Sequence, residues 1–118
     1  MGRLTTHVLD QYRGRPAAGI RICLYRMDQD AAPAKVAEAA TNDDGRLDQP
    51  ILSDTAMREG TYQLEFDAAA YFQMTGTPLA SGSFLDVVVI RFVISSKDEH
   101  YHVPLLLSPY GYATYRGS

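Results

Sequence analysis

The sequence predicts an all-β fold, an antiparallel β-sandwich with one short helix. Apolar and polar residues alternate along most of the chain, which is the two-residue period of a strand with one buried face. Turn-forming clusters such as GRPAAG, NDDGR and SPYG separate these stretches at close intervals. With 118 residues, 46% of them hydrophobic, the chain is long enough to bury a core without disulfides or a metal.

Seven or eight short strands are expected, and the clearest of them is IRICLYR. Its alternation places Ile20, Ile22 and Leu24 on one face and leaves Cys23 half exposed on the other. TYQLEF repeats this pattern around Leu64. The expected strands cover residues 4–10, 20–26, 35–41, 61–66, 84–94, 100–107 and 112–116.

One short helix is expected at DAAAYFQM, where good helix formers follow Asp67, a residue that can cap them. The stretch TGTP then ends this helix. The longest apolar run is VVVI followed by Arg91 and FVI, well short of the ~20 residues that a membrane helix needs. This run predicts a buried strand instead.

The composition and charge of the chain exclude some classes of binding partner. A net charge of −3 and a pI of about 5.5 argue against nucleic acid, which favours a basic face. The first residues, MGRLTTHVLD, contain no apolar signal region, and the lone Cys23 allows no internal disulfide. We therefore expect a cytoplasmic protein that binds neither nucleic acid nor membranes.

The strand HYHVPLLL has one apolar face and one face that mixes histidine with apolar residues. Its odd-numbered residues, Tyr101 among them, are all apolar or aromatic and predict the core face. Its even-numbered face mixes histidine with apolar residues, which indicates a covered surface, either an interface or a pocket. That face consists of His100, His102, Pro104 and Leu106. The next stretch, YATYR, is expected to pair with this strand through SPYG as a hairpin.

Histidine and arginine supply the candidate chemistry. His7 shares a strand face with Thr5, and a histidine changes charge near neutral pH, so it is the usual proton carrier. Arg46 follows the DDG turn, where it is either solvated or a clamp for an anion or a carbonyl. His100 and His102, with His7 as a third ligand, leave a zinc site as an alternative. No GxSxG elbow is present, so no serine nucleophile is expected.

Four segments together resemble the 5-hydroxyisourate hydrolases, the transthyretin-like enzymes of urate breakdown. They are LTTHVLD with GRPA, TNDDGR, GTYQLEFDAAAYF and HYHVPLLLSPYGYATYRGS. The closing tetrapeptide YRGS is the most specific, because it separates these enzymes from the hormone carrier transthyretin. The resemblance covers nearly the whole chain.

The resemblance implies a transthyretin-like sandwich of two four-stranded sheets, with residues 1–118 forming a single hydrolase domain. It also implies a homotetramer whose sites lie in a channel between dimers, with no cofactor and no metal. One segment departs from the family pattern. FLDVVVI has Asp86 and Val87 where the family often has a Pro-Glu pair, and we expect this to alter the start of the strand, a loop or an interface rather than activity.

The implied activity is hydrolysis of 5-hydroxyisourate to 2-oxo-4-hydroxy-4-carboxy-5-ureidoimidazoline. His7 and His102 would activate water and transfer protons, and the resemblance leaves open which of them is the base. Arg46 would stabilise the developing anion, Tyr115 would hydrogen-bond to the flat ring or pack on it, and Ser118 would order the cluster. His100 would only flank the site.

Two other functions stay open. A non-catalytic transthyretin-type carrier would use the same channel for a flat ligand, but it would lack the histidine, arginine and tyrosine set. A structural sandwich that pairs through its outer face would leave HYH and YRGS unexplained.

Overall fold

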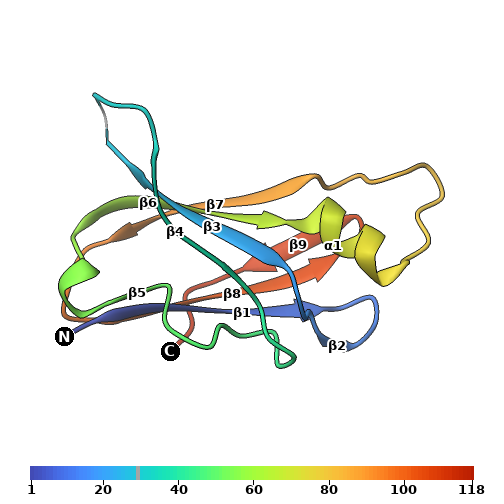
Figure 1. The fold of residues 1–118 in the computed structure, drawn as a ribbon, viewed down its shortest axis with the longest axis horizontal. Helices are drawn as coiled ribbons and strands as arrows, with labels where there is room; N and C mark the ends of the chain where they lie inside the picture. Colours follow the sequence, from blue (N-terminus) through green and yellow to red (C-terminus); the bar gives the residue numbers. More distant parts are fainter. Residues whose placement is uncertain (29) are drawn as a thin grey trace.

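The computed structural model describes residues 1–28 and 30–118. Two β-sheets pack face to face, and the one α-helix of the described residues lies at one end of them (Figure 1). The first sheet contains β1 (Arg3–Asp10), β2 (Arg15–Pro16), β5 (Leu52–Ser53), β8 (His100–Ser108) and β9 (Gly111–Thr114). The second contains β3 (Arg21–Met27), β4 (Ala34–Ala40), β6 (Gly60–Asp67) and β7 (Val87–Ile94). A short 3-10 helix, η1 (Asp54–Ala56), precedes β6, and α1 (Ala68–Thr75) follows it. The predicted all-β sandwich with one short helix is confirmed.

The first sheet has the order β2-β1-β8-β9, and β5 also pairs with β1. The two-residue strands β2 and β5 occupy opposite halves of one edge of β1, at Leu9–Asp10 and Arg3–Leu4. The sheet therefore has four strand positions, one of them shared. β1 and β8 run parallel over eight residues, so the expected antiparallel pairing is wrong for this pair. Alternation shows which face a strand buries but not the direction of its neighbour.

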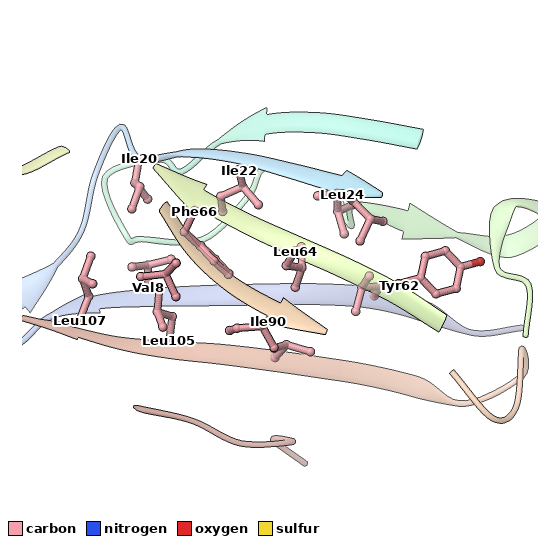
Figure 2. Close-up of a cluster of buried hydrophobic side chains, with 14 of the residues drawn as sticks. Val8, Ile20, Ile22, Leu24, Tyr62, Leu64, Phe66, Ile90, Leu105 and Leu107 are labelled. Atoms are coloured by element: carbon pink, nitrogen blue, oxygen red, sulfur yellow. The ribbon is translucent and has the colours of Figure 1, made fainter. Parts of the chain in front are cut away.

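The core is built from the alternating positions of both sheets (Figure 2). Leu24, Leu64 and Phe66 of the second sheet and Val8 and Leu105 of the first are completely buried. This confirms the core faces expected for IRICLYR, TYQLEF and HYHVPLLL. Each such side chain contributes about 1.5–3 kcal/mol by leaving water.

Strand β7 is an edge strand of the second sheet. It begins at Val87, three residues after the expected start, and Val87, Val89 and Val93 are 41%, 44% and 57% exposed. The expectation of a buried strand is therefore wrong for the outer face of β7 in this chain, whereas Val88, Ile90 and Ile94 on its other face are buried. Asp86 lies just before β7, where its carbonyl accepts the N–H of Ala69 at 3.0 Å.

Helix α1 is capped as the sequence predicts and is also anchored to β1. The Asp67 carboxylate accepts the N–H of Ala70 at 3.3 Å, which confirms the expected cap. The hydroxyl of Tyr71 donates to the buried carboxylate of Asp10 at 2.7 Å, and the N–H of Arg13 donates to the other carboxylate oxygen at 3.0 Å. Burial, reinforced by the Asp10 carboxylate, raises the pKa of Tyr71 to about 12. The helix is thereby tied to the end of β1.

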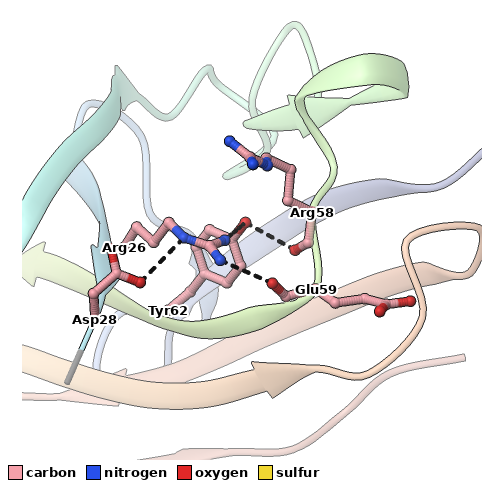
Figure 3. Close-up of polar contacts among 5 residues, drawn as sticks. All are labelled: Arg26, Asp28, Arg58, Glu59 and Tyr62. Carbon is pink, nitrogen blue, oxygen red and sulfur yellow. Dashed lines mark hydrogen bonds and ion pairs between the residues drawn. The ribbon is translucent and has the colours of Figure 1, made fainter.

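A second polar cluster lies at the C-terminal end of β3, around Arg26 (Figure 3). The Arg26 guanidinium lies 5.3 Å from the centre of the Tyr62 ring and donates to the Tyr62 hydroxyl at 2.8 Å and to the Glu59 carbonyl at 3.0 Å. It also pairs with Asp28 at 3.5 Å, and Tyr62 donates to the Arg58 carbonyl at 2.9 Å. These contacts hold the loop before β6 against β3.

Within the described ranges, no helix combines the length and the apolar character that crossing a bilayer requires. The cytoplasmic location stays a prediction.

Candidate active site

The candidate site lies on the outer face of the first sheet, where β1 and β8 run side by side. The register pairs Thr5 with His102 and His7 with Pro104. Thr5, His7 and His102 are half-buried and alternate with core residues, so their side chains share the outer face. Two strands from distant parts of the sequence thus bring both predicted histidines to one surface.

The turn NDDGR places Arg46 beside this surface. The Asn42 side chain accepts the N–H groups of Asp44 and Arg46 at 2.9 and 3.2 Å, which closes the turn. Gly45 has φ +75°, and its carbonyl accepts the N–H of Val8 at 2.8 Å. A Cβ on Gly45 would lie 2.4 Å from the Val8 carbonyl oxygen, so only glycine allows the turn to rest on β1.

His7 lies directly opposite Arg46 in an isolated β-bridge. Its Nε2 is 2.9 Å from the backbone carbonyl of Asp44. A carbonyl oxygen only accepts hydrogen bonds, so Nε2 carries a hydrogen and donates it. In the neutral ring, Nδ1 is then the nitrogen with the available lone pair.

His102 is held by a different kind of partner. Its Nδ1 lies 2.8 Å from the Thr5 hydroxyl, and its backbone carbonyl accepts the N–H of Gly117 at 2.7 Å. Burial lowers the pKa of His102 below the usual value of about 6.5, and the positive charge of Arg46 and then His7 lower it further. His102 is therefore neutral at pH 7.

A cavity of about 490 Å³ opens over these residues, a size suited to a small ligand. Three predicted site residues line it: Arg46, His102 and Ser118. His7 does not line the cavity but is the β-bridge partner of Arg46, which does. In residues 1–28 and 30–118, no three histidine, cysteine or acidic side chains are arranged to hold a metal ion.

Tyr115 is not brought into this cavity by the single chain. It is 59% exposed and lines a second hollow together with Tyr101 and Arg116. The last strand ends at Thr114, two residues earlier than expected. The register places Tyr115 opposite Pro104, which has no N–H to donate. The Pro104 carbonyl accepts a hydrogen bond from the Thr114 hydroxyl instead, at 2.8 Å. The ladder is interrupted here, and a single contact resumes it between Gly117 and His102.

Sequence reasoning missed several cavity residues. Arg3 and Gln49 line the cavity, and no motif singled them out. His100, predicted only to flank the site, lines it as well. Thr5 was recognised as a neighbour of His7 on one strand face, but its contact with His102 requires the parallel pairing of β1 with β8.

Fold and cavity together define a β-sandwich protein with a histidine and arginine site on the outer face of one sheet. The chain matches the HIUase/Transthyretin family over residues 4–117 and belongs to this family.

Its relatives include a 5-hydroxyisourate hydrolase of Pseudomonas aeruginosa, 54% identical over 118 residues, which are 100% of this chain and 93% of that protein. A crystal structure of an (S)-allantoin synthase superposes with a TM-score of 0.92 and 44% identity over 99% of this chain. This chain spans 44% of the length of that one. The structure of Klebsiella pneumoniae 5-hydroxyisourate hydrolase gives a TM-score of 0.82 and 34% identity, with complete coverage of both chains.

Proposed function

We propose that this chain is a hydrolase that converts 5-hydroxyisourate to 2-oxo-4-hydroxy-4-carboxy-5-ureidoimidazoline in urate degradation. The observation that carries the proposal is the convergence of His7, Arg46 and His102 on one outer face, beside a cavity of small-ligand size. The relatives named 5-hydroxyisourate hydrolase, similar over nearly their whole length, support the same substrate.

His7 serves as the general base. Its Nε2–H is fixed on the Asp44 carbonyl, so the Nδ1 lone pair takes a proton from the attacking water. The imidazolium that forms keeps its donor contact with that carbonyl, which stabilises the positive charge. General-base help of this kind contributes about 10²–10⁴-fold to the rate.

Arg46 and His102 stabilise the oxyanion that forms when water adds to the ring carbonyl. The Thr5 hydroxyl lies 2.8 Å from Nδ1 of His102. In the proposed mechanism it donates to Nδ1, so Nε2 of this neutral ring carries a hydrogen and acts as a donor. Arg46 adds a permanent positive charge. When the intermediate collapses, the carbon–nitrogen bond of the ring breaks and the proton on His7 passes to the nitrogen. The former carbonyl carbon becomes a carboxylic acid, which loses its remaining proton to solvent and ends as a carboxylate.

A homotetramer with the sites at the interface between dimers also belongs to this proposal. It is supported by the outer face of β8, where the apolar Leu106 is only half-buried in the single chain and lies on the same face as the histidines. The role of Tyr115, which lies outside the cavity of one chain, stays a prediction that depends on this assembly.

The test generates 5-hydroxyisourate from urate with uricase and follows its ultraviolet decay with and without the protein, the spontaneous decay serving as the baseline. We expect acceleration by the parent protein and a loss of about 10²–10³-fold in kcat for His102→Ala, because one oxyanion donor disappears. Tyr12→Ala, at an exposed residue that does not line the cavity, is the control and should lose far less. Circular dichroism and size-exclusion chromatography check that each variant keeps its fold and assembly.

Parental turnover in His102→Ala would show that the site is assigned wrongly. No acceleration by well-folded parent protein would favour the carrier function, which ligand-binding titrations with flat aromatic compounds then test.

A further inference from the structure

We propose that Thr5 and Gly117 are positioning residues that together hold the His102 ring in one orientation and one tautomer. This inference rests on the proposed function, in which the ring faces the substrate. Neither residue carries the chemistry itself. Thr5 acts on one ring nitrogen, and Gly117 acts on the opposite edge of the ring.

Thr5 reaches His102 across the parallel ladder. The two residues are register partners in β1 and β8, and the Thr5 hydroxyl lies 2.8 Å from Nδ1. Because both strands are held by eight paired positions, the hydroxyl cannot follow the ring if the ring turns. The contact therefore selects one ring orientation and engages one of its two nitrogens.

Gly117 closes the other side. A Cβ at position 117 would lie 2.6 Å from Cδ2 of His102, closer than real Cβ atoms approach, and 3.3 Å from Cγ, which is a tight contact. The Gly117 N–H also donates to the His102 carbonyl at 2.7 Å, so the backbone cannot retreat without losing this hydrogen bond. Only glycine permits this approach of the main chain to the ring.

The two contacts leave one ring atom for chemistry. Nδ1 is engaged by Thr5, and the Cδ2 edge is covered by Gly117, so Nε2 is the nitrogen that remains for a ligand in the cavity. A methyl group on residue 117 would rotate the ring and break the Thr5 contact. Misplacement of a reacting group by about 1 Å costs about 10²-fold in rate.

The first experiment compares Gly117→Ala with Gly111→Ala. A Cβ at Gly111 would meet only the Ser108 hydroxyl at 3.9 Å, an ordinary contact, so Gly111→Ala is a matched control in the same part of the chain. We expect kcat to fall about 10²-fold in Gly117→Ala, with a smaller change in KM, and to stay near the parental value in Gly111→Ala. Equal kcat in Gly117→Ala and the parent would overturn the role of Gly117.

The second experiment compares Thr5→Val, which keeps the shape of the side chain, with Thr5→Ser, which keeps the hydroxyl. Nitrogen-15 NMR of His102 should show one neutral tautomer, with hydrogen on Nε2, in the parent and in Thr5→Ser. Thr5→Val should show a mixture and lose about tenfold in kcat. An unchanged tautomer and kcat in Thr5→Val would overturn the role of Thr5, even if Gly117→Ala failed to fold.

The NMR measurement separates this proposal from the proposed function, because it needs no turnover. A parent protein inactive on 5-hydroxyisourate, whose His102 tautomer still depends on Thr5, would refute the function and keep the positioning. If the parent is active, and neither Gly117→Ala nor Thr5→Val changes kcat or the His102 tautomer, the positioning proposal alone is refuted.

Discussion

A neutral histidine beside a permanent cation is the central feature at the scale of single residues. Burial first, and the Arg46 charge second, lower the pKa of His102. A protonated His102 would repel the guanidinium and would have no lone pair at Nδ1 for the Thr5 hydroxyl. The neutral form is thus required both by the local electrostatics and by the proposed hydrogen bonds.

This neutrality predicts a pH dependence of stability. The folded pKa of His102 lies below the unfolded value of about 6.5, so the unfolded chain binds more protons between these two values. The contribution of His102 to the free energy of unfolding is therefore fully present above about pH 6.5 and is lost as the pH falls through the folded pKa. Urea unfolding from pH 5 to 8 measures it.

His102→Gln is the control for that measurement, since glutamine does not titrate. The difference in the free energy of unfolding between parent and variant should change with pH below about 6.5 and stay constant above it. A difference that is independent of pH throughout this range would contradict the assignment.

At the scale of residues, the sequence predicted the candidate site residues that its motifs contain and missed those that matter only through a contact. His7, Arg46 and His102 were predicted because their residue types suit proton transfer and anion stabilisation. Thr5 matters through a partner 97 positions away, and Gly117 matters because a side chain is absent. Neither property has a signature in local periodicity.

At the scale of secondary-structure elements, the anchoring of α1 to β1 depends on one buried carboxylate. Asp10 is 1% exposed, and Tyr71 and the Arg13 N–H are its hydrogen-bond donors in the described chain. Asp10 follows the β1 positions that carry Thr5 and His7. The helix therefore helps to fix the strand that bears the proposed base.

Tyr71→Phe tests this anchor. The substitution keeps the buried ring but removes a donor from a charged acceptor, so we expect a loss of about 1.5–3 kcal/mol in the free energy of unfolding. Tyr112→Phe, at a tyrosine that is 47% exposed, should change stability far less. Chemical denaturation of both variants at pH 7 makes the comparison, and equal stabilities would show that Asp10 finds another donor.

Element types were predictable where alternation or capping was strong, as in β3, β6 and α1. Two boundaries were not. β7 begins only after Asp86, whose carbonyl accepts a hydrogen bond from α1, and β9 stops where Pro104 has no N–H to offer. Both boundaries are decided by a partner that lies elsewhere in the chain, as is the parallel direction of β1 and β8.

At the scale of the whole molecule, the core and the site are separable. The buried side chains of both sheets lie within residues 4–107, whereas residues 115–118 contribute Ser118 to the cavity, the Gly117 contact on His102 and an Arg116 guanidinium 4.1 Å from the centre of the Tyr101 ring. The Arg116–Tyr101 contact contributes only about 0.5–1 kcal/mol to the free energy of unfolding.

A chain that stops at Thr114 should therefore lose its activity on 5-hydroxyisourate and still unfold cooperatively. Differential scanning calorimetry and the uricase-coupled assay measure the two properties on the same sample. Activity that persists without residues 115–118 would contradict the role assigned to this segment, and a chain without a cooperative transition would show that the core depends on it.

The parallel pair of β1 and β8 also has a consequence for synthesis on the ribosome. β1 leaves the ribosome early, but its main partner is made more than eighty residues later, and only β2 and β5 can pair with it earlier, over two residues each. β2 and β5 lie on the other side of β1, so the edge that β8 covers remains open during translation, and open strand edges promote association between chains. The proposed base and the proposed oxyanion donor lie on these same two strands, so a nascent chain gains its chemistry only when this exposed edge is finally covered.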